Sequence, residues 1–158
     1  MAPRTPVGRS RTARGLTVIE LLITVAIVAV LAAIALPSWA KYQHRVRVDQ
    51  ARKDIVVMSA TVSRYWLDAR AYPVSLADAG LGTPLDPWGR PYRYLDLGNP
   101  SNRGLARKDH SLVPINTDFD LYSMGPDGLS VPPLTAPQSH DDIVRANDGA
   151  FVGVAADY

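Results

Sequence analysis

The sequence predicts an α+β fold in which one long N-terminal helix packs on a small antiparallel β-sheet. Three patterns in the 158 residues indicate it. An almost entirely apolar run extends from Leu16 to Leu36, and an amphipathic stripe with helical spacing continues to about Arg70. Beyond residue 72 the chain breaks into short alternating segments separated by Gly and Pro, as is typical of antiparallel strands.

The apolar run is long enough to cross a membrane. As a helix, Leu16–Leu36 would be about 31 Å long, which is roughly the thickness of the hydrocarbon core of a bilayer. Its only polar side chains are those of Thr17, Glu20 and Thr24. The residues before it carry four positive charges and no negative one: Arg4, Arg9, Arg11 and Arg14. This asymmetry predicts that the N-terminus stays in the cytoplasm and that the rest of the chain lies outside.

Glu20 is the only glutamate in the chain. A carboxylate within hydrocarbon is costly, so we expect it to have a function and a cationic partner. Two simpler interpretations do not account for it. An ordinary secretory signal, cut at Ala33-Ile34-Ala35, would have an apolar core of only about 7 to 15 residues. A plain membrane anchor explains the length of the run but leaves Glu20 without a partner.

Segment 14–21, Arg-Gly-Leu-Thr-Val-Ile-Glu-Leu, resembles the processing site of type IV pilins and of the pseudopilins of type II secretion. The resemblance implies that a prepilin peptidase cuts after Gly15 and methylates the new amine of Leu16. Glu20 then falls at the fifth mature position. Pro37 falls at the twenty-second, where these proteins loosen the helix. Leu16 stands where the family usually has phenylalanine.

Cleavage after Gly15 would create the cation that Glu20 lacks. The new α-amine of Leu16 would titrate at about pH 8 and would lie one helical turn from the Glu20 carboxylate. The family implies that Glu20 meets mainly the amine of a neighbouring subunit. This buried ion pair would then set the axial stagger of subunits in a helical filament.

The resemblance divides the chain into four parts. These are a cleaved leader (1–15), a transmembrane and filament-core helix (16–37), its amphipathic continuation (38–71), and the loop and sheet region of a periplasmic globular domain (72–158). Without the leader, 13 basic residues face 15 acidic ones. The chain has no cysteine, so its stability in an oxidising compartment must come from packing or a bound ion. Many type IV pilins use a disulfide, whereas the major pseudopilin uses calcium, so this composition favours the pseudopilin.

The amphipathic part predicts one buried helix face, formed by Val48, Ala51, Ile55, Met58, Val62, Tyr65 and Ala69. Trp39, Tyr42 and Val46 are expected to meet neighbouring subunits or the lipid interface. A basic cluster occupies the same stretch: Lys41, Arg45, Arg47, Arg52 and Lys53. Because Asp49 and Asp54 interleave with it, the main interpretation is a solvated helix face without nucleic acid, and DNA binding is the alternative.

After Tyr72-Pro73, residues 75–78 are expected to form a short turn of helix. Segment 86–95, Asp-Pro-Trp-Gly-Arg-Pro-Tyr-Arg-Tyr-Leu, resembles a signature of major pseudopilins. It predicts a turn that directs Trp88 into the fold, followed by a strand with Tyr92 and Tyr94 on one face.

The last third of the chain predicts two strands and a loop. Residues 99–116 are expected to form a surface loop or a short hairpin. A strand is expected over 118–124, ended by the Gly-Pro-Asp-Gly turn at 125–128. Phe151 to Val154 are expected to form a final strand or a packed tail.

Segment 121–128, Leu-Tyr-Ser-Met-Gly-Pro-Asp-Gly, resembles the start of the calcium loop of the pseudopilins. The resemblance implies five ligands: the backbone carbonyls of Met124 and Leu129, and the carboxylates of Asp127, Asp141 and Asp142. Eight aspartates against one basic residue, Arg145, from position 109 onward also suit a hard cation. The alternative is an ordinary Asp-Gly turn with solvated aspartates. Segment 130–140 is longer than expected for the family, which leaves open which of the paired aspartates is the ligand.

The resemblance implies a structural subunit of a type II secretion pseudopilus, most like the major pseudopilin, or G subunit. Such a subunit is processed by prepilin peptidase and polymerises with itself and with minor pseudopilins. An inner-membrane platform with a cytoplasmic ATPase drives assembly, and the filament helps move folded exoproteins across the outer membrane. The subunit would cross the bacterial inner membrane once, with its globular domain in the periplasm.

Two other functions are alternatives, and a third is not expected. A minor type IV or competence pilin would serve adhesion, twitching or DNA uptake. A membrane-tethered monomer would bind a soluble partner without polymerising. An enzyme is not expected. The three histidines, His44, His110 and His140, are scattered along the sequence, and the chain has no phosphate loop, zinc spacing or nucleophile motif.

Overall fold

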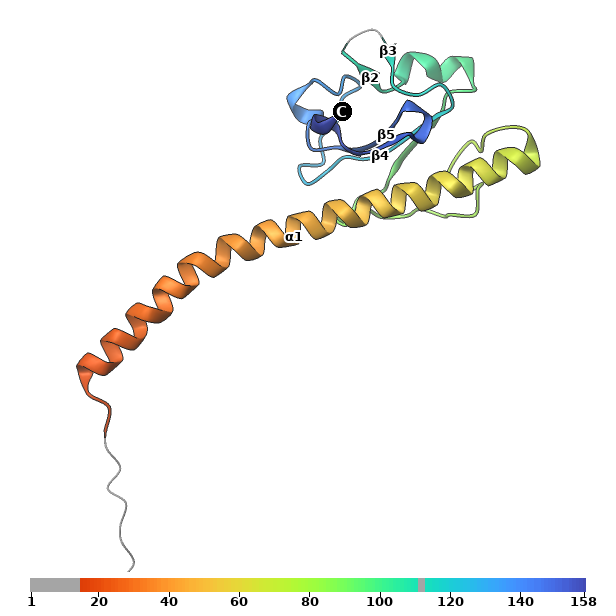
Figure 1. The fold of residues 1–158 in the computed structure, drawn as a ribbon. Coiled ribbons are helices and arrows are strands. Elements are labelled where there is room, and N and C mark those ends of the chain that lie inside the picture. Colours follow the sequence, from red (N-terminus) through yellow and green to blue (C-terminus); the bar gives the residue numbers. More distant parts are fainter. Residues whose placement is uncertain (1–14, 111–112) are drawn as a thin grey trace, which may run out of the picture. The chain divides into compact units, whose positions relative to one another are not determined.

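The computed structural model describes residues 15–110 and 113–158 (Figure 1). It has one long helix, α1 (Val18–Ala69), and six strands. The strands are β1 (Arg93–Asp96), β2 (Lys108–Asp109), β3 (Val113–Pro114), β4 (Phe119–Ser123), β5 (Ile143–Ala146) and β6 (Phe151–Val154). Short 3-10 turns are η1 (Pro100–Leu105), η2 (Pro137–Ser139), η3 (Asn147–Gly149) and η4 (Ala155–Asp157). The predicted α+β, pilin-like architecture is confirmed.

The chain forms two compact units, residues 1–41 and 42–158, and each is described by itself. Of the first unit, the predicted leader lies outside the described residues except for Gly15. The described part is the apolar portion of α1, whose large side chains are exposed in the single chain. Pro37 lies inside α1, which continues through it. Among the described residues, α1 is the one helix long and apolar enough to cross a membrane.

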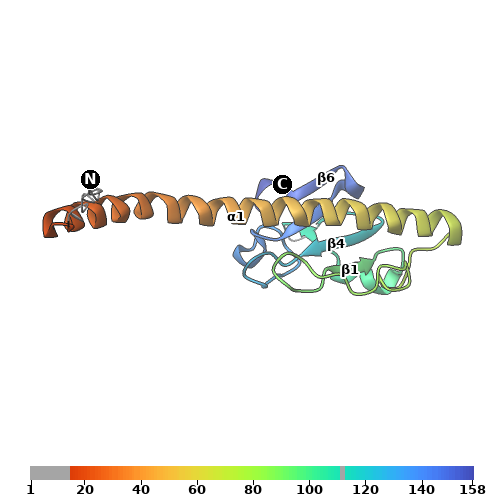
Figure 2. The same cartoon turned by 90° about the horizontal axis from the view of Figure 1, so that it is seen from below.

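In the second unit, α1 buries the central part of the predicted stripe, whereas Ala69 at its end is exposed. Ala51, Ile55, Met58 and Val62 are buried and form one core cluster with side chains of β1, β4 and β5. Figure 2 shows β1 and β4 beside this part of the helix. Tyr65, towards the end of the predicted stripe, is only half-buried. The stripe therefore covers the sheet mainly through its central turns.

The helix α1 ends at a residue whose backbone is in the left-handed region. Arg70 has a φ of 57°, and its N–H still bonds to the carbonyl of Trp66 at 2.8 Å. Tyr72 then turns inward, and its ring lies 5.6 Å from that of Phe119. The expected helical turn at 75–78 is a non-helical turn. Ser75 and Asp78 close it with reciprocal side-chain to backbone hydrogen bonds.

The main sheet is antiparallel throughout, in the order β1-β4-β5-β6. Its two faces bury different side chains. Phe119, Leu121 and Ile143 join the cluster under α1, whereas Val144 and Ala146 pack on the opposite face with loop residues. The predicted strands around 92–95, 118–124 and 151–154 are confirmed, and β2 and β3 pair as the expected hairpin. β5 was not predicted, although it lies inside the sheet.

Candidate functional site

Glu20 lies in the first turn of α1, where it closes a capping box with Thr17. The carboxylate of Glu20 accepts hydrogen bonds from the Thr17 N–H at 2.9 Å and from its hydroxyl at 2.8 Å. In return, the Glu20 N–H donates to the Thr17 hydroxyl oxygen at 3.3 Å. This reciprocal pattern satisfies backbone groups that a helix start leaves unpaired. It also occupies the carboxylate within the single chain.

The predicted processing bond, between Gly15 and Leu16, precedes this cap. Both residues are non-helical and exposed, so the bond lies just outside the helix. Within residues 15–110 and 113–158, Glu20 makes no ion pair. The charge of Glu20 did not predict this local role, although the Thr-x-x-Glu spacing of residues 17–20 signals a capping box.

The loop from β4 to β5 holds the predicted calcium ligands. Gly125 has a φ of 62°, and a Cβ placed there would lie 2.3 Å from the Asp141 carbonyl oxygen. Only glycine therefore lets the two ends of the loop approach this closely. The Asp127 N–H donates to the Asp141 carboxylate at 3.2 Å, and the Asp127 carboxylate accepts from the Leu129 N–H at 2.7 Å. The structure thus brings Asp127 and Asp141 together.

Asp142 points elsewhere. It is fully buried and forms an ion pair with Arg107, which is 3 % exposed. The Ser130 hydroxyl donates to the same carboxylate oxygen at 2.7 Å. Burial raises the pKa of Asp142 to about 6, and the Ser130 and Arg107 donors oppose the rise. The carboxyl therefore remains mostly ionised at neutral pH.

The predicted ligands do not fit one calcium ion in this arrangement. Calcium takes about six to eight oxygen ligands. The Met124 carbonyl already accepts from the Gly128 N–H, and the three aspartates accept from protein donors. Across the described parts of the chain, no three side chains of the metal-binding types gather as a site. Asp142 Oδ1 is buried without a hydrogen-bond partner, but a single oxygen is far too few. Calcium binding itself stays a prediction.

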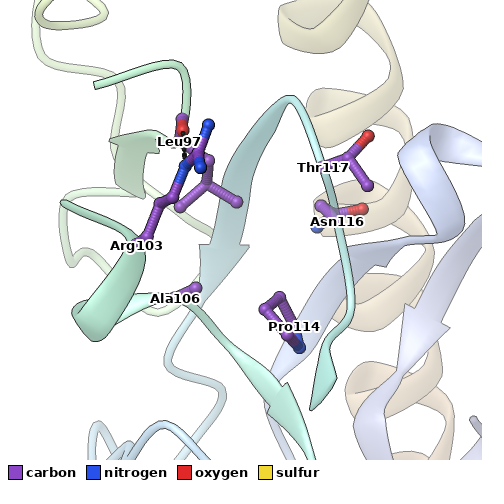
Figure 3. Close-up of a pocket in the computed structure, with 6 residues that line it drawn as sticks. All are labelled: Leu97, Arg103, Ala106, Pro114, Asn116 and Thr117. Atoms are coloured by element: carbon purple, nitrogen blue, oxygen red, sulfur yellow. Dashed lines mark hydrogen bonds between the residues drawn. The ribbon is translucent and has the colours of Figure 1, made fainter. Parts of the chain in front are cut away.

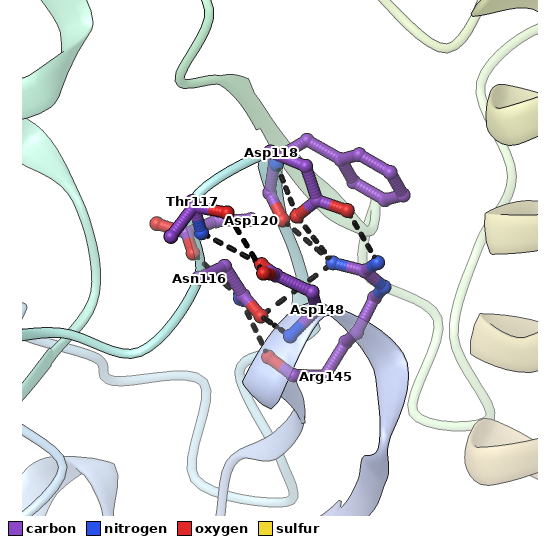
Figure 4. A network of polar contacts seen from close by, with 7 residues as sticks. Asn116, Thr117, Asp118, Asp120, Arg145 and Asp148 are labelled. Carbon is purple, nitrogen blue, oxygen red and sulfur yellow. Dashed lines mark hydrogen bonds and ion pairs between the residues drawn. The ribbon is translucent and has the colours of Figure 1, made fainter.

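A second polar network joins the start of β4 to the end of β5 (Figure 4). Arg145, 4 % exposed, forms two parallel bonds to the Asp118 carboxylate at 2.7 and 2.6 Å, and its guanidinium lies 4.0 Å from the centre of the Phe119 ring. The Asn116 amide bridges Asp120 and the Arg145 carbonyl, both at 2.9 Å. The network has a structural role, because the opposite charges of Arg145 and Asp118 pair with each other inside the fold.

A cavity of about 380 Å³ lies between η1 and the chain leading into β4 (Figure 3). Its lining residues are Leu97, Arg103, Ala106, Pro114, Asn116 and Thr117. They offer one cation, an amide and a hydroxyl, but no carboxylate or histidine. This lining does not supply an acid and base pair for catalysis. The expectation that the chain is not an enzyme stays a prediction.

Comparison with known proteins gives two kinds of match. Residues 10–36 match the prokaryotic N-terminal methylation motif. Type II secretion system core protein G of Pseudomonas aeruginosa is 31% identical over 139 residues, which cover 75% of this chain and 87% of that protein. The protein of the same name from Dickeya chrysanthemi is 26% identical, over 88% of this chain and 90% of its own length. The fimbrial protein of Neisseria meningitidis serogroup A is 33% identical, over 90% and 85%. No solved structure matches significantly.

Proposed function

The chain belongs to the pilin-like family of type II secretion system core protein G, and from this premise we propose that it is a structural subunit of a secretion pseudopilus. The observation that carries the proposal is the similarity over 87% of the length of the Pseudomonas protein. The methylation motif alone covers only residues 10–36 and would suit any pilin-like protein. The longer match extends over most of the Pseudomonas protein, and the fimbrial protein of Neisseria meningitidis is matched over a similar share of its length, 85%.

The N-terminal geometry supports a two-stage role for Glu20. Before processing, Thr17 supplies its hydrogen bonds and the helix start is capped. Cleavage after Gly15 would place an α-amine on Leu16, four residues before Glu20, and a neighbouring subunit would present another. In a filament core, the exposed apolar side chains of α1 would pack on those of other subunits, and the amine and carboxylate would pair away from water.

The orientation and partners follow from the same proposal. Four arginines before the apolar run would hold the leader on the cytoplasmic side, so the peptidase would act at the inner membrane. The sheet domain would lie in the periplasm. Assembly would require minor pseudopilins, an inner-membrane platform and a cytoplasmic ATPase, and the filament would help drive folded exoproteins across the outer membrane.

A deletion with complementation tests the function. Loss of the chain should abolish exoprotein release and leave twitching and DNA uptake intact. The wild-type gene should restore release, and Glu20→Leu should not. Arg93→Gln, at an exposed position on β1, is the matched control and should restore it fully. Normal exoprotein release without the chain would refute the proposal.

The similarity to fimbrial proteins supports a second candidate, a minor type IV or competence pilin. In that case the same deletion would remove twitching, adhesion or DNA uptake. A membrane-tethered monomer is the third candidate. Cysteines introduced into the apolar half of α1 would crosslink copies of a filament subunit and would leave such a monomer uncrosslinked.

A further inference from the structure

Arg107 is placed as a metal cation would be in the loop between β4 and β5. Its guanidinium is buried and reaches three kinds of oxygen: the Ser130 hydroxyl, the Val131 carbonyl at 2.6 Å and the Asp142 carboxylate. These are the oxygen types that hard cations prefer. The guanidinium also lies 4.4 Å from the centre of the Tyr122 ring, which is a favourable cation–π distance.

The backbone on both sides holds Arg107 in this position. Its own N–H donates to Asp120 at 2.6 Å, and its carbonyl accepts from Ile115 at 3.0 Å. The next residue, Lys108, forms two backbone hydrogen bonds with the loop. Its N–H donates to the Pro132 carbonyl and its carbonyl accepts from the Leu134 N–H, each at 2.9 Å. These backbone hydrogen bonds fix the main chain at Arg107, and so they hold the guanidinium next to the loop.

A second guanidinium holds the first part of the same loop. Arg90 donates to the Gly125 carbonyl at 2.7 Å and to the Pro126 carbonyl at 3.2 and 3.3 Å. Gly128 faces this side chain so closely that a Cβ there would lie 2.5 Å from it. Arg90 and Arg107 thus bind carbonyl, hydroxyl and carboxylate oxygens at both ends of the segment that carries Asp127.

We propose that the Arg107 guanidinium takes the place of a metal cation in this loop, with Arg90 as its counterpart, so that the loop closes on Asp142 without calcium. A calcium ion at Asp142 Oδ2 would have to displace Arg107 and leave a guanidinium buried without a carboxylate, which is strongly unfavourable. The proposal concerns the folding of this chain and does not rest on its role in secretion.

The first test compares the full-length chain in detergent micelles with saturating calcium and with EGTA. We expect the same thermal midpoint in both, and the same hydrogen exchange for residues 125–142. A loop that needed the ion would raise the midpoint by on the order of 10 °C in calcium, because the ion would bind only the folded state. Such a rise, or slower exchange of the loop in calcium, would overturn the proposal.

The second test removes the charge. Arg107→Gln should lower the midpoint and speed exchange of residues 125–142, and Arg107→Gln combined with Asp142→Asn should recover part of the loss, because the carboxylate is then no longer buried unpaired. Arg93→Gln is the control and should behave as wild type. If Arg107→Gln leaves the midpoint and the loop unchanged, Arg107 does not hold the loop. If Arg107→Gln does not fold, the calcium and EGTA comparison of the wild type still decides.

Discussion

The carboxylate of Asp86 accepts a hydrogen bond from the hydroxyl of Ser123 at 2.6 Å, although the two residues are 37 positions apart. Its other oxygen accepts from the N–H groups of Trp88 and Arg90, which closes the turn before β1. The Ser123 hydroxyl oxygen in turn accepts from the Gly125 N–H at 3.1 Å. This chain of bonds joins the 86–95 segment to the 121–128 segment through one buried carboxylate.

Asp86→Ala should therefore destabilise the domain by on the order of 3 kcal/mol, because it removes bonds to a charged acceptor and leaves buried donors unpaired. Ser123→Ala, which keeps the turn bonds of Asp86, should cost less. Denaturant unfolding of the full-length chain in micelles measures both. Equal losses for the two variants would show that the turn bonds contribute nothing.

Arg145→Ala should be among the most damaging substitutions in the sheet. It leaves Asp118 without its cation and removes contacts to Phe119, and breaking a buried pair in this way costs about 3 to 5 kcal/mol. Arg145→Lys should recover only part of that, since lysine cannot make the two parallel bonds. A double-mutant cycle with Asp118→Asn measures the coupling. Additive effects would contradict a direct pairing.

Glu20→Gln separates the two roles proposed for Glu20. Glutamine keeps an acceptor for the Thr17 cap, so hydrogen exchange at the start of α1 should stay close to wild type. Filament assembly should still fall by about a hundredfold, because the neutral amide cannot pair with an amine. Thr17→Val should have the opposite pair of effects: faster hydrogen exchange at the start of α1 and a smaller loss of filament assembly than Glu20→Gln. Normal assembly of Glu20→Gln would contradict the ion pair.

Two tyrosines should resist ionisation at high pH. Burial raises the pKa of Tyr92, and the hydrogen bond to Asp54 at 2.9 Å adds to the rise; burial also raises the pKa of Tyr94. Because these folded-state pKa values exceed the unfolded value of about 10, the stability they contribute is present below that pH and lost as the pH rises above it.

Absorbance titration of the seven tyrosines should thus show a late fraction that ionises only as the domain unfolds. Tyr92→Phe should shrink that fraction. Tyr65→Phe also removes one tyrosine but leaves the contact between Tyr92 and Asp54 intact, so it is the matched control. A single smooth titration of all seven, with the fold intact, would refute the assignment.

The aspartates of the last third of the chain have partners that their count in the sequence does not reveal. Counted from position 109, eight aspartates face only Arg145, which pointed to a metal ion. Arg107 lies just before that window, and the fold pairs it with Asp142. Arg145 pairs with Asp118, and Asp120 accepts only from neutral N–H donors. Three of the eight aspartates are therefore satisfied inside the fold by partners that the sequence count does not reveal.

β5 shows a second reason for a missed prediction. Strand prediction depends on alternation between apolar and polar residues, and all four residues of β5 are buried. Arg145 reads as a surface residue in the sequence, but its charge is neutralised by a carboxylate that is 27 positions away. A local sequence pattern cannot reveal that Asp118 is the partner of Arg145.

By itself, the sequence determined the elements that depend on local order: the apolar and amphipathic halves of α1, the turns at glycine and proline, the strands with alternating residues, and the methylation motif. These follow from periodicity and backbone sterics, which act over a few residues. Only the tertiary structure decided which carboxylate meets which cation. Those pairs form between residues far apart in the chain, and their energies depend on distance and burial that exist only once the sheet has closed.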